Sequence, residues 1–485
     1  MQHTVDRLEE LGFLEAEYAR PGSSFIIVYG RRRLGKTHVL RHFLQGKPGL
    51  YYLATEEAEV ENIRGFQAQV AGFVGSALLA KGSGFSWSDL FEALRERDSA
   101  TKKVIVIDEF QYLGKANRAF PSVLQKIWDE RLKDANVMLI LCGSLITMMH
   151  SQTLAYESPL YGRRTGQIRM RQIPFRYYHE FFPGMAATEL IERWAVTGGV
   201  PKYIEAFRSG GDIYQGMRES ILTPHGYLYE EPIFLLEREV SEISRYLSIV
   251  KGIAHGHHKL GKLASALGVA QHKLTEYLAT LINLDLVERQ VPVTEKNPEK
   301  SKRGLYFLRD NFITFWFRFV FPYRSQIEMQ HVDYVLEKLH EGFIPGHVSY
   351  VFERVCLEWV AETQCGGAFF EAQKTGRWWN DREEIDVVAL NEDTRDILFG
   401  ECKYSANPVD TDAFYALRQK SAAVKWNLGH RQDYYVLFSK AGFTSDLCAL
   451  AARQPNLRLF EAKGEAKGTE LFASEAKGTE LFASG

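Results

Sequence analysis

The chain has 485 residues, of which 45% are hydrophobic and 25% charged, so a globular protein of several domains is expected and global disorder is excluded. The 59 Lys and Arg residues nearly balance the 61 Asp and Glu residues, giving a formal net charge of −2. Net charge therefore does not indicate a nucleic-acid partner, and any basic surface must be local. The five cysteines form no CxxC pair, which favours a reducing compartment over a disulfide framework or a zinc site.

The pattern of apolar runs divides the chain into three sections and a tail. Residues 1–210 alternate strand and helix patterns, as expected for an α/β sheet domain with a small helical lid. Residues 211–330 are mostly helical in pattern, and residues 331–460 return to a mixed α/β pattern. The segment EAKGTELFAS occurs twice within residues 461–485, which we interpret as a low-complexity tail or tag without a functional role.

No segment is expected to enter a membrane. The most apolar stretch, residues 312–321, has about half of the ~20 residues that a membrane span needs. Arg318 also interrupts it, so a buried core helix is the better interpretation. The N-terminal residues are acidic and amphipathic and show no secretory signal, and a cytoplasmic protein is therefore expected.

The first functional motif comes after the apolar run FIIVY at residues 25–29, which predicts a buried strand. The next residues read GRRRLGKT, and a helical pattern comes after them. This arrangement is typical of a phosphate-binding loop, whose backbone N–H groups and helix N-terminus surround phosphate oxygens. Lys36 is expected to reach the β and γ phosphates, and Thr37 to offer its hydroxyl to Mg²⁺. The predicted nucleotide-binding residues are Gly30, Arg31, Arg32, Arg33, Leu34, Gly35, Lys36, Thr37 and His38.

A second apolar run, residues 104–107, ends in a pair of carboxylates. We expect Asp108 to hold Mg²⁺, and Glu109 to polarise the attacking water as a general base. A further strand pattern at residues 50–53 leaves room for a strand between the phosphate-loop strand and the Asp-Glu strand. No NKxD tetrapeptide is present, so ATP is favoured over GTP. The predicted fold class is an α/β P-loop NTPase of the ASCE type, with a parallel sheet.

Polar residues after a third apolar run, residues 137–141, complete the predicted catalytic set. Ser144 is a candidate for sensing the γ phosphate or orienting the water, although a small residue is equally expected in a strand-to-helix turn. Arg163 and Arg164 lie in a segment without acidic residues between Glu157 and Glu180. Either is a candidate arginine finger, supplied in cis or by a neighbouring subunit of a homo-oligomer. A solvated basic face is the alternative.

The chain resembles the bacterial and archaeal ATPase family that combines a P-loop domain of the AAA/STAND type with a C-terminal nuclease-like domain. The resemblance rests on five motifs, VYGRRRLGKT, VIVIDEFQYL, LCGS, SPLYGRR and TGGVPKY. It covers residues from about 5 to 450. The resemblance implies ATP binding and ATP hydrolysis, and it does not name a substrate.

The middle section has the outline of a helix-turn-helix with a β wing. Helical patterns flank a turn at Gly268, and strand patterns at residues 286–289 and 305–308 enclose a polar stretch. Residues 251–310 hold ten Lys or Arg and six Asp or Glu residues, a local positive surplus. Contact with DNA and docking on protein are both consistent with this pattern. The candidate contacts are Gln271, His272, Lys273 and Thr275 on the recognition helix, and Lys300, Lys302 and Arg303 on the wing.

The C-terminal section contains a carboxylate within the strand EIDVVAL and, after a turn, the sequence ECK. Asp386 and Glu401 are predicted to hold one or two divalent cations, Mg²⁺ or Mn²⁺. Lys403, two residues after Glu401, shares its face of the strand and would assist the nucleophile. The pattern resembles the PD-(D/E)XK nuclease superfamily, which implies a restriction-endonuclease-like domain and makes Glu353 a candidate third ligand. Ile385 replaces the proline typical of that superfamily.

These motifs support two functional hypotheses. In the first, an ATP-driven enzyme acts on DNA: the winged helix places the DNA and the C-terminal metal site cuts it. In the second, the chain is a nucleotide-switched regulator or defence-assembly scaffold whose nuclease-like domain binds without cutting. An ordinary charged hairpin is the simplest alternative for Asp386, Glu401 and Lys403.

Overall fold

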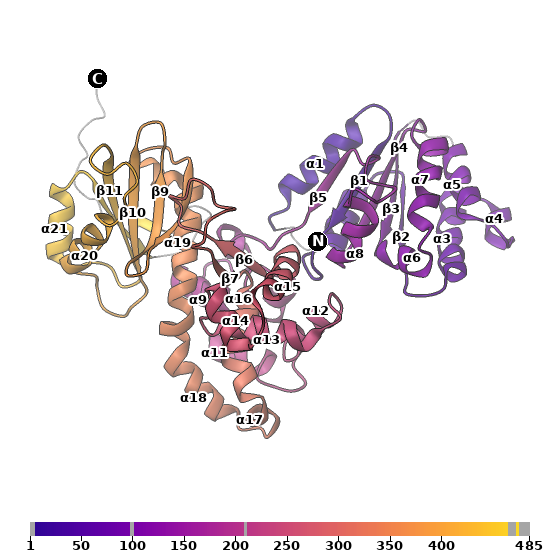
Figure 1. Cartoon of the computed structure of the whole chain (residues 1–485). Helices are drawn as coiled ribbons and strands as arrows, with labels where there is room; N and C mark the ends of the chain where they lie inside the picture. Colours follow the sequence, from indigo (N-terminus) through magenta and orange to yellow (C-terminus); the bar gives the residue numbers. More distant parts are fainter. Residues whose placement is uncertain (1–4, 98–100, 208–210, 464–471, 475–485) are drawn as a thin grey trace. The chain divides into compact units, whose positions relative to one another are not determined.

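The computed structural model describes residues 5–97, 101–207, 211–463 and 472–474, which form two compact units (Figure 1). The first unit comprises Met1–Ile173, Val200–Lys202 and Leu235–Ser241. The second comprises Pro174–Gly199, Tyr203–Phe234 and Glu242–Gly485. None of the described helices combines the length and the apolar character needed to cross a bilayer. The three-domain division expected from the sequence stays a prediction.

The first unit is built on a five-stranded parallel sheet with the order β2-β3-β4-β1-β5. Its strands are β1 (Ser24–Tyr29), β2 (Gly49–Leu53), β3 (Lys103–Asp108), β4 (Val137–Gly143) and β5 (Gly166–Arg169). Its helices are α1 (Leu8–Ala19), α2 (Lys36–Leu44), α3 (Glu59–Val74), α4 (Ala77–Lys81), α5 (Trp87–Glu96), α6 (Gln111–Ala116), α7 (Phe120–Ile127) and α8 (Ile146–Met149). The predicted α/β class and parallel sheet are confirmed.

The position of each strand in this sheet agrees with its burial. All seven residues of β4 are buried, which suits a strand covered by helices on both faces, and β4 lies between β1 and β3. Residues of β2 alternate between buried and partly exposed, and β2 takes the edge of the sheet. The strand between the phosphate-loop strand and the Asp-Glu strand is therefore β4, and the strand pattern at residues 50–53 lies outside them.

The next helices along the chain belong mostly to the second unit. They are α9 (Ala187–Thr197), α10 (Pro201–Ala206), α11 (Ile213–Ser220), α12 (Glu231–Glu237), α13 (Ile243–Ala254), α14 (Leu260–Leu267), α15 (Gln271–Asn283), α16 (Asn311–Phe315), α17 (Arg324–Glu328), α18 (Val332–Phe343) and α19 (Ser349–Thr363). Pro201 and Lys202 of α10 and Leu235–Glu237 of α12 belong to the first unit. The strands β6 (Val287–Gln290) and β7 (Leu305–Leu308) pair antiparallel after α15. Most of the apolar stretch at residues 312–321 is buried, as expected, and Arg318 donates to Ala254 O at 2.7 Å.

A mixed six-stranded sheet, in the order β13-β12-β11-β10-β9-β8, completes the second unit (Figure 1). Its elements are β8 (Lys374–Trp379), β9 (Glu384–Leu390), β10 (Asp396–Lys403), α20 (Thr411–Ser421), β11 (Gln432–Ser439), α21 (Ser445–Arg453), β12 (Leu457–Ala462) and β13 (Phe472–Ser474). Helix α19 contacts β8, β9 and β10, and α20 packs on β9, β10 and β11. The predicted tail contributes the end of β12, Lys463 and all of β13, and its other residues lie outside the described part of the chain.

His347, just before α19, is fully buried, and its Nε2 lies 2.6 Å from Ala195 O. Because a carbonyl oxygen can only accept, Nε2 carries the proton of a neutral ring. Burial lowers the pKa of His347 from 6.5 to about 3. A histidine that is protonated in the unfolded chain and neutral in the folded one stabilises the fold above its unfolded pKa, and this stabilisation is lost as pH falls.

We therefore predict that His347→Gln flattens the acid limb of stability. Between pH 6.5 and about 3, the unfolding free energy of the wild type should fall more steeply than that of the variant, by up to about 1.4 kcal/mol per pH unit. Urea titrations across that window measure the difference. The exposed His430→Gln is the control and should behave like the wild type. Parallel curves for His347→Gln and the wild type would contradict the prediction.

Candidate functional site: a phosphate-binding loop and a carboxylate cluster

The loop between β1 and α2 is shaped by two glycines. Gly30 has φ of 151°, and a Cβ at this position would lie 2.5 Å from Met170 O. Gly35 has φ of 88°, in the left-handed region that favours glycine. Helix α2 begins at Lys36, so the N-terminus of that helix closes the loop, as the sequence motif predicts.

Lys36 is buried within this loop. Its Nζ donates to Gly30 O and Arg31 O, each at 2.7 Å, so the ammonium group lies across the inside of the loop. Burial lowers the pKa of Lys36, while the nearby carboxylates of Asp108 and Glu109 oppose that shift. The predicted loop residues Leu34 and Arg31 are also buried, and Thr37 and His38 are exposed at the start of α2.

Asp108, at the end of β3, accepts three hydrogen bonds. Its Oδ2 accepts from the hydroxyl of Thr37 at 2.7 Å and from the hydroxyl of Tyr51, while its Oδ1 accepts from the backbone N–H of Glu109 at 2.9 Å. Burial, with the adjacent Asp108 charge, raises the pKa of Tyr51 above its ordinary value. No sequence motif indicated Tyr51, whose only signal is its place in a strand that pairs with β3.

Glu109 adopts φ of 53°, a left-handed conformation that a non-glycine residue seldom takes. This conformation places its carboxylate against Ser144, whose hydroxyl lies 2.7 Å from Oε2 and 3.0 Å from Oε1. Gln111 also donates to Glu109. Arg32 lies on the other side of Ser144, with Nε 3.3 Å from the Ser144 hydroxyl. The structure thus brings Glu109 and Ser144 together, although the sequence placed them on different strands.

The two candidate finger arginines have partners in their own surroundings. Arg163 pairs with Asp129 at 3.0 Å and donates to Pro159 O at 3.2 Å. Arg164 donates to Tyr161 O at 3.1 Å, with its guanidinium 5.0 Å from the centre of the Tyr161 ring. These contacts hold both arginines locally and do not involve the phosphate-binding loop. The finger role stays a prediction.

Glu239 is a residue of this region that no sequence motif indicated. It lies in Leu235–Ser241, which packs with the first unit despite its distance in sequence. Its Oε1 accepts from the backbone N–H of Ile146, at the start of α8, at 3.2 Å. Burial raises the pKa of Glu239, and the charges of Arg31 and Arg32 partly offset that rise. The only sequence signal is that Glu239 comes after the basic residue Arg238 in a polar segment, which is not specific.

The C-terminal candidates of the second unit lie near the start of β9, which carries Asp386, and near the end of β10, which carries Glu401 and Lys403. Asp386 Oδ2 accepts from the backbone N–H of Cys402 at 2.9 Å, which fixes it beside β10. Glu401 pairs with Lys403 at 2.7 Å and with Lys420 of α20 at 2.9 Å. Glu401 and Lys403 are therefore neighbours, as their spacing predicts. Lys420 was missed, because it lies on α20, 19 residues after Glu401 in the chain.

The third candidate carboxylate, Glu353, projects from α19. Arg377 of β8 lies 3.2 Å from it, and only 11% of the Arg377 side chain is exposed. Burial, with repulsion from Asp386, raises the pKa of Glu353 to about 8. Burial, with repulsion from Glu401, raises the pKa of Asp386 to about 6. The carboxylates thus lie close enough to repel one another, and the basic residues around them offset that repulsion.

The described residues contain no ready-made group of three or more His, Cys, Asp or Glu side chains able to hold a metal ion. Glu353 and Glu401 each face a basic partner in this region. Asp386 and Glu401 offer oxygen donors of the kind that Mg²⁺ and Mn²⁺ prefer. A metal at this place stays a prediction.

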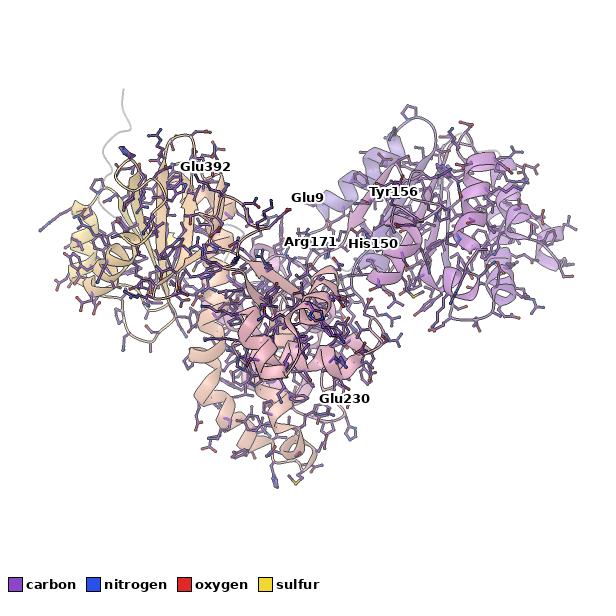
Figure 2. The ribbon with its side chains drawn as sticks, viewed as in Figure 1. Glu9, His150, Tyr156, Arg171, Glu230 and Glu392 are labelled. Carbon is purple, nitrogen blue, oxygen red and sulfur yellow. The ribbon has the colours of Figure 1, made fainter. Side chains whose placement is uncertain are left out.

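Figure 2 shows the side chains of both units and labels Glu392, which lies in the turn between β9 and β10.

The candidates of the middle section are exposed. Gln271, His272, Lys273 and Thr275 lie on the first turns of α15, where the hydroxyl of Thr275 donates to Gln271 O at 2.9 Å. Lys300, Lys302 and Arg303 lie in the connection between β6 and β7, and Arg303 pairs with Glu295.

The sheet, the glycine-shaped loop and the Asp-Glu strand together define the first unit as a P-loop ATPase domain. Residues 4–207 match the family described as an ATPase domain predominantly from Archaea. Residues 316–416 match a family described as archaeal and bacterial proteins of unknown function. The chain is 35% identical over 439 residues to the Methanocaldococcus jannaschii protein MJECL04, with 90% of this chain and 95% of that protein covered. The chain therefore belongs to the same protein family as MJECL04.

Two further similarities cover less of the chain. A stretch of 43 residues is 49% identical to the ATP-binding protein MJ0423 of the same organism, covering 9% of this chain and 73% of that protein. The Walker-type ATPase PABY2304 of Pyrococcus abyssi superposes with a TM-score of 0.52 at 21% identity, covering 65% of this chain and 96% of that one. At this identity the superposition shows the fold alone.

Proposed function

We propose that this P-loop ATPase acts on nucleic acid, with ATP turnover in the first unit and a nuclease-like metal site in the second. The observation that carries the proposal is the meeting of Asp386 and Glu401 beside Lys403 and Lys420, in a chain that also holds a phosphate-binding loop. Two carboxylates with adjacent ammonium groups suit a divalent cation and a phosphodiester. The helices α13 to α15 with the β6–β7 hairpin would act as a winged helix that holds the duplex.

In the first unit, each group around the loop has a proposed role. Lys36 binds the β and γ phosphates once it exchanges its two carbonyl partners for phosphate oxygens. Thr37 and Asp108, whose oxygens already lie 2.7 Å apart, would hold Mg²⁺, which neutralises phosphate charge when bound. Glu109 accepts the proton of the attacking water, and Ser144 holds its carboxylate in place.

One observation favours a second function. Both lysines beside Glu401 pair with it, so the cluster is compensated without a cation. A nucleotide-switched scaffold, in which the second unit binds without cutting, is consistent with this compensation. Metal-dependent cleavage separates the two functions.

We predict that Lys36→Ala and Glu109→Gln have different effects on ATP. Removing the Lys36 ammonium should weaken ATP binding about tenfold or more, since charge-assisted hydrogen bonds contribute about 1.5–3 kcal/mol. Glu109→Gln should keep ATP affinity and lower turnover by about 100-fold or more, because only the base is lost. Isothermal titration and a phosphate-release assay measure both. Lys115→Ala, an exposed lysine of α6, is the control, and wild-type affinity in Lys36→Ala would refute the assignment.

The rate of ATP hydrolysis should respond to nucleic acid. We expect duplex DNA to raise the rate at low salt, and added salt to remove the effect, because phosphate neutralisation releases counterions. Phosphate release is measured with duplex DNA, single-stranded DNA, RNA and no polymer. A rate unchanged by all three polymers, together with no detectable binding, would contradict a role on nucleic acid.

The metal hypothesis gives a third prediction. Mn²⁺ in large excess should raise the melting temperature by mass action, corresponding to about 2.7 kcal/mol at 100 times Kd. Glu401→Ala should reduce that shift, while Lys403→Ala should retain it and abolish any cleavage of plasmid DNA, because lysine is not a ligand. Glu392→Ala is the matched control, as Glu392 is exposed and pairs with Lys374 at 2.6 Å.

Nucleotide is left out of these melts, so that the phosphate-binding loop contributes equally to every variant. Equal shifts of the melting temperature in Glu401→Ala and Glu392→Ala would show that the metal does not bind at the carboxylate cluster. If Glu401→Ala loses the shift and the wild type cleaves no DNA, the result would favour a scaffold that binds without cutting.

A further inference from the structure

A groove of about 780 Å³ lies within the second unit, where the hairpin region meets the six-stranded sheet. Its walls are the start of α14, the start of α15, the β6–β7 connection and the turn between β8 and β9. We call it the cationic groove, defined by its five basic residues, Lys259, Lys262, Arg289, Lys302 and Arg303. Among the described residues that line it, Asp381 is the one carboxylate.

Two of the five basic side chains, those of Lys259 and Arg303, pair with a carboxylate in the described part of the chain. Lys259 lies 3.4 Å from Asp381, whose side chain is 97% exposed, and an exposed pair of this kind contributes at most about 1 kcal/mol. Arg289 donates to two backbone carbonyls, Pro298 O at 2.9 Å and Ser301 O at 2.6 Å. In the described part of the chain, Lys262 and Lys302 pair with no carboxylate. Arg303, in contrast, has a close acidic partner in Glu295.

The floor of the groove does not suit a stacked base. Tyr306 and Trp379 are buried, at 7% and 8% exposure, and the Trp379 indole N–H donates to Arg303 O at 3.2 Å. Single strands are held mainly by bases stacked on exposed aromatic rings, and the lining offers no such ring among the described residues. Exposed lysines on flexible stems instead suit the phosphates of a duplex backbone.

The groove also lies close to the carboxylate cluster along the sheet. Trp379 of β8 pairs with Glu384 at the start of β9, so the β8–β9 turn that walls the groove leads directly into β9. Asp386 is two residues beyond Glu384, about 7 Å along the strand. The strand that carries Asp386 therefore begins beside the wall of the groove.

We propose that the cationic groove binds consecutive phosphates of duplex DNA and directs the backbone toward Asp386 and Glu401. This inference rests on the proposed action on nucleic acid, and adds the surface that holds the duplex. Because α14, the hairpin and the sheet all contribute walls, the duplex would contact the sheet as well as the helix-turn-helix. Lys302 acts within the groove, while Lys300 lies outside it.

The test uses Lys262→Glu with Lys302→Glu in the full chain and a fluorescently labelled duplex, with anisotropy measured over a salt series. Affinity near physiological salt should fall at least tenfold. The slope of log affinity against log salt should decrease by about two, one for each lost phosphate contact. The matched control is Lys133→Glu with Lys296→Glu, which makes the same charge change at two exposed residues outside the groove. It should lose less than about threefold in affinity.

Melting temperatures show whether each variant folds. Lys262→Gln with Lys302→Gln should give an intermediate loss of affinity.

The outcomes separate the groove from the wider function. If the groove variant binds the duplex as well as the wild type does, the proposal that the groove binds DNA is wrong. The proposed action on nucleic acid would not be affected. Equal losses of affinity in the groove variant and its control would show that general surface charge causes the effect. The proposed role of the groove would then be wrong. If the wild type binds a single strand more tightly than the duplex, the proposed ligand is wrong. If the wild type binds neither, the groove and the proposed function both fail.

Discussion

The carboxylate of Asp108 is the constraint on which the nucleotide site depends. It accepts from Thr37 of α2, from Tyr51 of β2 and from the backbone N–H of Glu109, and so links the phosphate-binding loop to two strands. A buried carboxylate is tolerated only when it is well hydrogen-bonded, so these donors must stay in place. The same backbone bond accompanies the left-handed conformation of Glu109, which directs that side chain to Ser144.

In the second unit, nearby basic side chains stabilise the buried carboxylates. Three carboxylates in one region would repel one another, and burial strengthens that repulsion because the surroundings have a low dielectric constant. Arg377, Lys403 and Lys420 offset it, each from a different element of the sheet or its covering helix. A cation bound there would compete with these basic partners, so the lysines and the metal are alternatives around Glu401.

Much of the first unit could be predicted from the sequence, because its signals are local. The runs at residues 25–29 and 104–107 are apolar throughout, as expected for strands buried on both faces, and the loop motif predicts the glycine-shaped turn and the start of α2. The order of the strands could not be predicted this way, since the central place of β4 depends on pairing between distant segments. Tyr51, Lys420 and Arg377 were missed for the same reason, as each meets its partner only through tertiary packing.

The return of Leu235–Ser241 to the first unit has a consequence for anyone who dissects the chain. The backbone passes between the units five times, after residues 173, 199, 202, 234 and 241. No single continuous fragment therefore contains the whole ATPase unit and nothing else. A fragment ending near residue 210 would lose the buried side chain of Leu236 and leave the first N–H of α8 without Glu239. Truncation would thus report on a damaged ATPase, and a circularly permuted or linker-joined chain would be the sound way to isolate it.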